Sequence, residues 1–136
     1  MTTVRPFLMF QDGNAQAALD FYFATFPDSR MVQIERYTQD EPAPAGTIKV
    51  ATFTLCGREF MCSDSPIKHN FSFTPANSIF VEFDSASELE RVFILLSARG
   101  QVLMPLDNYG FSQRFGWVTD QFGVSWQLNL AAQAQG

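Results

Sequence analysis

The first half of the chain alternates short apolar stretches with polar turns, in an order that predicts one strand, one helix and three further strands. Residues 4–10 are apolar and bounded by turn residues, which is typical of a strand. Residues 15–26 contain neither Gly nor Pro, and their apolar positions recur at steps of three and four, which predicts a helix ended by Pro27. Asp12 or Asn14 can cap it. Alternating positions predict the three further strands at residues 29–37, 47–55 and 58–63.

The second half repeats this order of elements. Residues 77–83 predict a strand, and Ser85 and Glu88 then have the spacing of a capping box before a helical pattern. That helix is predicted to end at Gly100, because Gly is typical of the position after a helix. The segment Asp120-Gln121-Phe122-Gly123 predicts a tight turn. The remaining pattern predicts strands at 101–106, where Pro105 interrupts it, 114–119 and 124–130, and a frayed tail at 131–136.

The repeated order of strand, helix and three strands predicts an α+β fold made of two βαβββ modules. Module 1 covers about residues 3–64 and module 2 about residues 77–130, and a loop joins them into a single domain of residues 1–136. We expect each helix to cover one face of its sheet. The other faces of these curved mixed sheets are then expected to enclose a cavity.

Composition adds an aromatic interior to this picture. The 136 residues are 46% hydrophobic and include 15 Phe, which predicts a core or a pocket lined largely by aromatic rings. The two cysteines, Cys56 and Cys62, are predicted to be a reduced, buried pair. They do not predict a metal site, because no second pair of Cys or His accompanies them.

The charge pattern excludes two classes of partner. Nine Lys and Arg stand against fourteen Asp and Glu, and the basic residues are scattered singly. Binding to nucleic acid or to an anionic membrane needs a cluster of basic side chains, so neither partner is expected. No apolar run approaches the about 18 residues of a membrane span, and residues 1–7 lack the apolar stretch of a secretory signal. We therefore expect a cytoplasmic protein.

Several motifs resemble one known family. They are Asp12-Gly13-Asn14-Ala15, Met104-Pro105-Leu106, Ser112-Gln113-Arg114-Phe115-Gly116-Trp117-Val118-Thr119-Asp120 and Gln121-Phe122-Gly123-Val124-Ser125-Trp126-Gln127-Leu128. In these the chain resembles, over nearly its whole length, the PhnB-like or 3-demethylubiquinone-9 3-methyltransferase-like family. That family belongs to the vicinal-oxygen-chelate superfamily, which includes glyoxalases, bleomycin-resistance proteins and extradiol dioxygenases. The resemblance implies two βαβββ modules, usually a homodimer, and pockets formed by the concave sheets.

The methyl-transfer activity in that family name is not predicted by the residues. A typical methyltransferase holds its nucleotide-like cofactor on a Gly-rich loop after the first strand of a doubly wound parallel sheet. Here the corresponding turn is Gln11-Asp12-Gly13-Asn14, and no parallel series of strands and helices follows. We therefore expect a protein that is not a typical SAM methyltransferase.

The resemblance also marks metal-binding positions. Enzymes of the superfamily bind a divalent metal there through His, Glu or Gln side chains on the outer strands of the modules. The matching residues are Phe7, Ser78 and Gln127, with Val50 or a neighbour on the third strand. A catalytic metal needs about three ligand side chains aimed at one point. Only Gln127, with the nearby Glu82, can supply a ligand atom of the expected kind. The sequence therefore predicts no metal and no cofactor.

Strand alternation selects the residues that face the expected cavity. On the last strand Trp126 is predicted to face the core and Gln127 the cavity. Tyr109 and Trp117 are candidates for an aromatic wall with a polar tip. Arg114 can bind an anionic group or bridge a dimer. The full set of expected ligand-binding residues is Phe7, Met9, Ser78, Phe80, Tyr109, Arg114 and Gln127.

Two residues are candidates for a catalytic base. Glu82, on a strand that otherwise lines the cavity, would have a raised pKa if buried, but it can equally form an ion pair with Arg58 or Arg114. His69, the one imidazole, lies in the loop between the modules and either acts on a ligand or is an exposed loop residue. Cys62 is read as a small buried side chain rather than a nucleophile.

Three functions remain open from the sequence. The first is a protein of the PhnB-like family that binds a small, partly aromatic metabolite in a metal-free cavity. The second is an enzyme of the lyase, isomerase or transferase type that uses Glu82 or His69 as base. The third is a structural dimer module with a closed core. The fold does not choose among them, because it hosts many chemistries.

Overall fold

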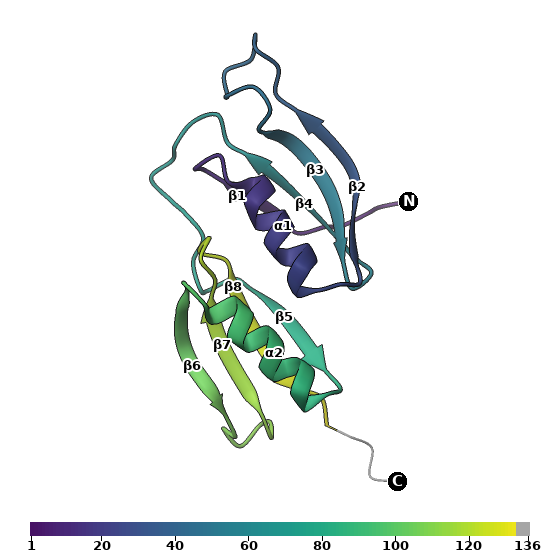
Figure 1. Cartoon of the computed structure of the whole chain (residues 1–136), viewed down its shortest axis with the longest axis vertical. Helices are drawn as coiled ribbons and strands as arrows, with labels where there is room; N and C mark the ends of the chain where they lie inside the picture. The colour runs from purple at the N-terminus through teal and green to yellow at the C-terminus, as the bar shows by residue number, and fades with distance from the viewer. Residues whose placement is uncertain (133–136) are drawn as a thin grey trace. The chain divides into compact units, whose positions relative to one another are not determined.

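A computed structural model describes residues 1–132 of the chain; the predicted tail therefore lies partly outside the described residues. The chain separates into two compact units, unit 1 (Met1–Phe71) and unit 2 (from Ser72 on). Figure 1 shows that each contains one helix lying along one face of a sheet. The elements of unit 1 are β1 (Phe7–Phe10), α1 (Ala15–Thr25), β2 (Ser29–Arg36), β3 (Ile48–Leu55) and β4 (Arg58–Asp64). Those of unit 2 are β5 (Ser78–Phe83), α2 (Ala86–Ser97), β6 (Gln101–Asp107), β7 (Phe115–Thr119) and β8 (Ser125–Leu130).

The two sheets have the same topology. The strand order is β1-β4-β3-β2 in unit 1 and β5-β8-β7-β6 in unit 2. In each sheet the first strand pairs in parallel with the last, and the other neighbours are antiparallel. The predicted α+β fold with two βαβββ modules is confirmed.

The helix of unit 1 is anchored by a residue far away in the sequence. Asn14 is the N-cap residue of α1, but its side chain makes no capping hydrogen bond. Asp64, at the end of β4 and buried, accepts hydrogen bonds from Ala15 N at 2.9 Å and from Ile48 N at 2.8 Å. Asp12 forms an ion pair with Lys68. The prediction that the side chain of Asp12 or Asn14 caps this helix is thus wrong. The carboxylate of Asp64 accepts the hydrogen bond at the helix N-terminus instead.

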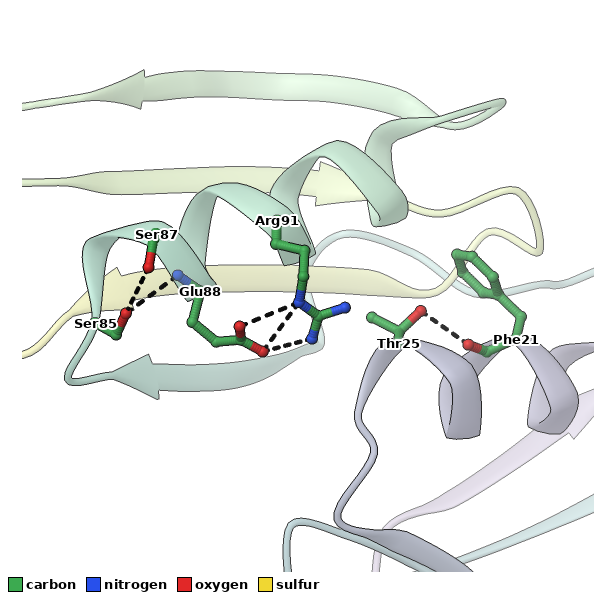
Figure 2. Close-up of polar contacts among 6 residues, drawn as sticks. All are labelled: Phe21, Thr25, Ser85, Ser87, Glu88 and Arg91. Atoms are coloured by element: carbon green, nitrogen blue, oxygen red, sulfur yellow. Dashed lines mark hydrogen bonds and ion pairs between the residues drawn. The ribbon is translucent and has the colours of Figure 1, made fainter.

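The helix of unit 2 begins as predicted and ends earlier. Ser85 Oγ accepts a hydrogen bond from Glu88 N, as Figure 2 shows. The carboxylate of Glu88 bonds to Arg91, so the second half of the capping box is replaced by an ion pair on the helix surface. The same figure shows the end of α1, where Thr25 Oγ1 donates to Phe21 O.

Gly100 is required for a different reason from the predicted one. The left-handed residue after α2 is Arg99, with φ of 63°, and not Gly100. A Cβ on Gly100 would lie 2.1 Å from the carbonyl oxygen of Thr119. Glycine is therefore needed here for close approach to a neighbouring strand.

Two strands also differ from the prediction by more than a shift of one residue at an end. β1 begins at Phe7 rather than at residue 4. β6 continues through Pro105 to Asp107, because an edge strand tolerates a residue without an N–H, and its pairing with β7 is irregular there. The predicted turn at Asp120 is confirmed, since Asp120 Oδ1 accepts hydrogen bonds from Phe122 N and Val124 N.

The cysteines are not the buried pair that the sequence predicted. Neither cysteine forms a disulfide; Cys62 is buried, but Cys56 is exposed. Cys56 lies in the tight turn between β3 and β4 with φ of 50°, which carries its side chain out of the sheet. Burial, and then the charge of Asp64, raises the pKa of Cys62 to about 12. None of the described helices is long and apolar enough to cross a membrane.

Candidate functional site

The sheet of unit 2 has one face against α2 and one open face. On β8 Trp126 and Leu128 are fully buried, as predicted for Trp126. A Cβ on Gly116 of β7 would contact Phe93 of α2, so Gly116 also faces the helix. The alternate residues of these strands therefore point to the open face.

The strand register arranges the residues of the open face in three rows across the sheet. The first row holds Ser78, Ser125 and Thr119, which pair across β5, β8 and β7. The second row consists of Phe80, Gln127, Trp117 and Met104. The third row consists of Glu82, Asn129, Phe115 and Asp107. The structure thus brings four predicted site residues, namely Ser78, Phe80, Glu82 and Gln127, onto one face.

Four side chains of this face form one hydrogen-bonded network. Trp117 Nε1 donates to Ser125 Oγ at 2.8 Å, and Ser125 Oγ lies 2.6 Å from Ser78 Oγ. Ser78 Oγ also accepts from Gln127 Nε2 at 3.3 Å and donates to Pro75 O at 3.3 Å. These contacts fix the rotamers of Ser78, Ser125 and Gln127. A site whose polar groups are held in place in this way binds without first ordering its side chains.

An aromatic group adjoins the third row. Phe111 contacts Phe115 edge-on with ring centroids 5.0 Å apart, and Tyr109 stacks on Phe111 at 6.2 Å. Tyr109 is fixed by a hydrogen bond from its hydroxyl to Pro105 O. Phe111 is 68% exposed and Tyr109 37%, so both rings present area to solvent. We define these three residues, Tyr109, Phe111 and Phe115, as the aromatic group.

Sequence reasoning selected only Tyr109 of this group. Phe111 and Phe115 were missed, although aromatic residues on both sides of Gly110, directly before a strand, were a usable signal. Strand alternation puts Ser125 on the same face as Gln127, but its position as the link between Trp117 and Ser78 depends on contacts across strands.

Glu82 and Phe80 lie on β5 at the edge of the face. Phe80 is 55% exposed, which is unusual for a side chain of this size in a strand. Glu82 is also exposed, so the burial on which its role as a base depends is absent. Arg114 forms an ion pair with Glu90 of α2 at 3.0 Å, and therefore does not provide the predicted partner for Glu82.

Arg114 lies at the margin of the face rather than on it. Its ion pair with Glu90 directs one guanidinium nitrogen toward the helix. Its Nε and the Oδ1 of Asn129 are both buried and have no hydrogen-bond partner among the described residues. An anionic ligand would thus have to compete with the carboxylate of Glu90 for the guanidinium of Arg114.

Phe7 and Met9 lie on the open face of the sheet of unit 1. They alternate with Leu8 and with Phe10, which is buried, and pair with Met61 and Ser63 of β4. Phe7 is 52% exposed. Their role as ligand contacts stays a prediction.

His69 is part of a loop that folds back on unit 1. Gln11 accepts a hydrogen bond from His69 N at 2.6 Å and donates to Phe71 O at 2.7 Å. The imidazole stacks on the Phe71 ring with centroids 4.7 Å apart, and its Nε2 lies 3.4 Å from Ser65 Oγ. His69 is thus positioned by local contacts, and its role as a base stays a prediction.

The described residues contain no group of three or more His, Cys, Asp or Glu side chains that could hold a metal ion. At the positions that the resemblance marks, Phe7 has no ligand atom, and Ser78 accepts a hydrogen bond from Gln127. These donors do not fit a catalytic divalent metal, which prefers carboxylate, imidazole or thiolate ligands.

Comparison with known proteins identifies the relatives of the chain. The sequence model of the family described as 3-demethylubiquinone-9 3-methyltransferase matches residues 2–129. Protein YjdN of Escherichia coli (strain K12) is 26% identical over 141 residues, which cover 94% of this chain and 95% of YjdN. A putative 3-demethylubiquinone-9 3-methyltransferase, PhnB protein, from Bacillus cereus is 48% identical with a TM-score of 0.91, covering 96% of this chain and 100% of that chain.

More distant structures share the fold alone. The fosfomycin resistance protein FosX from Listeria monocytogenes is 10% identical, with a TM-score of 0.63 over 97% of this chain and 94% of that chain. The two βαβββ units therefore define a protein of the glyoxalase/bleomycin-resistance fold. Within that class, the chain belongs to the 3-demethylubiquinone-9 3-methyltransferase family, the PhnB-like family that its motifs resemble.

Proposed function

We propose that the chain binds a small, partly aromatic metabolite on the open face of the sheet of unit 2, and that it does so without a metal. The observation that carries the proposal is the fixed polar network of Ser78, Ser125, Trp117 and Gln127 beside exposed aromatic rings. Binding sites for small molecules combine apolar and aromatic walls with a few placed polar groups. The second row supplies this combination, since Phe80 and Trp117 flank the amide of Gln127.

Binding is proposed in preference to methyl transfer or another reaction. The described sheets are both mixed, and neither is the doubly wound parallel sheet on which a typical methyltransferase holds its cofactor. Glu82 is exposed and the imidazole of His69 stacks on Phe71, so no observed contact favours either residue as a base.

Isothermal titration of the full chain with 4-ethylphenol tests the proposed site. Phe80→Ala is expected to weaken binding about tenfold, because loss of a stacking ring costs roughly 1.4 kcal/mol. The control is Ile94→Ala, which removes a comparably exposed apolar side chain from α2, on the other face of the sheet. Equal affinity of the wild type and Phe80→Ala for 4-ethylphenol would show that the second row is not part of the binding site.

The metal-free part of the proposal has a separate test. The purified chain is incubated with Mn²⁺, Zn²⁺ or Ni²⁺, desalted and submitted to elemental analysis. We expect less than one tenth of an equivalent of metal per chain. One tightly held equivalent of metal per chain would overturn the proposal that the chain binds its ligand without a metal.

We further propose that the chain forms a homodimer, as the family resemblance implies, and that it works in the cytoplasm, the compartment expected from the sequence. Static light scattering is expected to give twice the mass of the chain at micromolar concentration. The mass of a single chain would contradict the proposed dimer while leaving the binding site of unit 2 as it is.

A further inference from the structure

We infer that the occupant of the open face of unit 2 is an aromatic amine, in which a ring carries a positively charged nitrogen on a short arm. This inference rests on the proposed function and narrows its class of ligand. Three independent features of the face support it: the distribution of charged side chains, the direction of the hydrogen bonds and the exposed rings.

The charged side chains of unit 2 leave the face without a cation. From residue 72 on, the sequence contains three Arg, no Lys or His, and six Asp or Glu. Arg91 and Arg114 form ion pairs with Glu88 and Glu90 of α2, and Arg99 lies in the turn after that helix. None of the three belongs to the rows of the open face. Glu82 and Asp107 do, and both are exposed, so the local potential favours a positive ligand.

The direction of the hydrogen bonds points the same way. An indole N–H can only donate and a carbonyl oxygen can only accept. Trp117 therefore donates to Ser125, Ser125 donates to Ser78, and Ser78 donates to Pro75 O. The hydroxyl protons of Ser125 and Ser78 are thus both used within the network. Gln127 donates to Ser78 from Nε2, which assigns its amide orientation and leaves its Oε1 as an acceptor. The network thus offers the Oε1 acceptor of Gln127 to a ligand N–H, and its hydroxyl protons are used, so the second Nε2 proton of Gln127 is the donor left to the network for an anion.

The exposed rings suit a cationic ligand as well as a neutral one. Phe80, Tyr109 and Phe111 expose ring area, and the face of an aromatic ring carries partial negative charge. A cation within about 6 Å of a ring centroid is attracted by roughly 0.5–1 kcal/mol at exposed sites. An anionic arm would meet the same faces unfavourably and would also be repelled by Glu82.

Three probes with the same phenol ring test the inference on the full chain. They are tyramine, which is cationic near neutral pH, 4-ethylphenol, which is neutral, and 4-hydroxyphenylpropionate, which is anionic. Affinities are measured by titration of the ¹H–¹⁵N spectrum at low and at 0.5 M salt. We expect tyramine to bind about three- to fivefold more tightly than 4-ethylphenol, with the anion weakest, and we expect salt to reduce the preference.

A pair of charge variants locates the origin of the preference. Glu82→Gln is expected to lower the ratio of tyramine to 4-ethylphenol affinity. Glu88→Gln, which removes a carboxylate from the surface of α2, is expected to keep the ratio. Tighter binding of the anion than of tyramine, or an unchanged ratio in Glu82→Gln, would overturn the inference and leave the proposed function standing. If none of the three probes shifts the resonances of the open face, the proposed function fails together with the inference.

Discussion

The two units share one topology but hold their helices by different means. In unit 2 the N-terminus of α2 is capped by Ser85, its immediate neighbour in sequence. In unit 1 the N-terminus of α1 is held by Asp64, which comes 49 residues after Ala15. The register makes Leu130 the counterpart of Asp64, since Phe10 pairs with Asp64 and Phe83 with Leu130. One repeat therefore uses a local cap where the other uses a buried carboxylate that ties a helix to two strands.

The open faces differ at equivalent positions too. Phe7 and Phe80 both lie on a first strand and are both exposed. The partner of Phe7 is Met61, whereas the partner of Phe80 is Gln127, which belongs to the polar network. At this pair of positions unit 1 thus presents two apolar side chains, whereas unit 2 presents an aromatic ring beside an amide. This difference is why the proposed ligand is assigned to unit 2.

Removal of the buried carboxylate is expected to have the largest effect on stability. Asp64→Ala leaves Ala15 N and Ile48 N without their acceptor, and each buried unpaired donor costs about 1–3 kcal/mol. We expect the free energy of unfolding to fall by about 4 kcal/mol, measured in urea. Ser85→Ala in unit 2 should cost only about 1 kcal/mol. Equal losses in the two variants would contradict the contrast between the two anchors.

The end of α2 provides the next largest effect. In Gly100→Ala the new methyl group meets the Thr119 carbonyl oxygen, which is part of a strand and cannot move aside. We expect a loss of about 2–3 kcal/mol in thermal or urea unfolding. Gly57→Ala is the control, because it has open space around the new Cβ and changes only a left-handed turn. A smaller loss in Gly100→Ala than in Gly57→Ala would refute the close-approach explanation.

Exchange of one side chain makes the second row of unit 2 resemble its counterpart in unit 1. Gln127→Met removes the amide that donates to Ser78 and reproduces the Phe–Met pair of Phe7 and Met61. We expect about fivefold weaker binding of tyramine in calorimetry, close to 1 kcal/mol, with little change in stability. Unchanged affinity would show that the polar network does not take part in binding.

Alkaline pH is expected to lower the stability of unit 1 through Cys62. This residue occupies the position in unit 1 that Leu128 occupies in unit 2. The thiol pKa is raised from 9.0 to about 12 in the folded chain, so the unfolded state loses its proton first. Below pH 9 the thiol is protonated in both states, so its burial costs no stability. As pH rises from 9 toward 12, the free energy of unfolding falls because the thiolate forms more readily in the unfolded state. We expect a loss of about 1 kcal/mol by pH 10. In Cys62→Ala this part of the pH dependence should disappear, although the variant starts less stable.

Features coded by near neighbours could be predicted from the sequence, and features made by distant contacts could not. The period of apolar residues predicted the order of elements and the burial of Trp126, and the Ser85 spacing predicted a helix start. The anchoring by Asp64 and the need for Gly100 depend on strands that lie far away in sequence. For the site, alternation assigned Ser78, Phe80 and Gln127 to one face. It did not indicate that Ser125 links them to Trp117, or that Phe111 and Phe115 lie together.

The central claim is that a ligand lies on the open face of unit 2, and the two tryptophans of the chain test it directly. Trp117 Nε1 belongs to the network on that face, whereas Trp126 Nε1 donates to the buried Asp120 on the face toward α2. The two indole N–H resonances are followed in ¹H–¹⁵N spectra during titration with tyramine. The structure predicts a saturable shift of the Trp117 resonance and a stationary Trp126 resonance. Saturable binding that leaves Trp117 in place, or that moves Trp126 alone, would contradict the assignment.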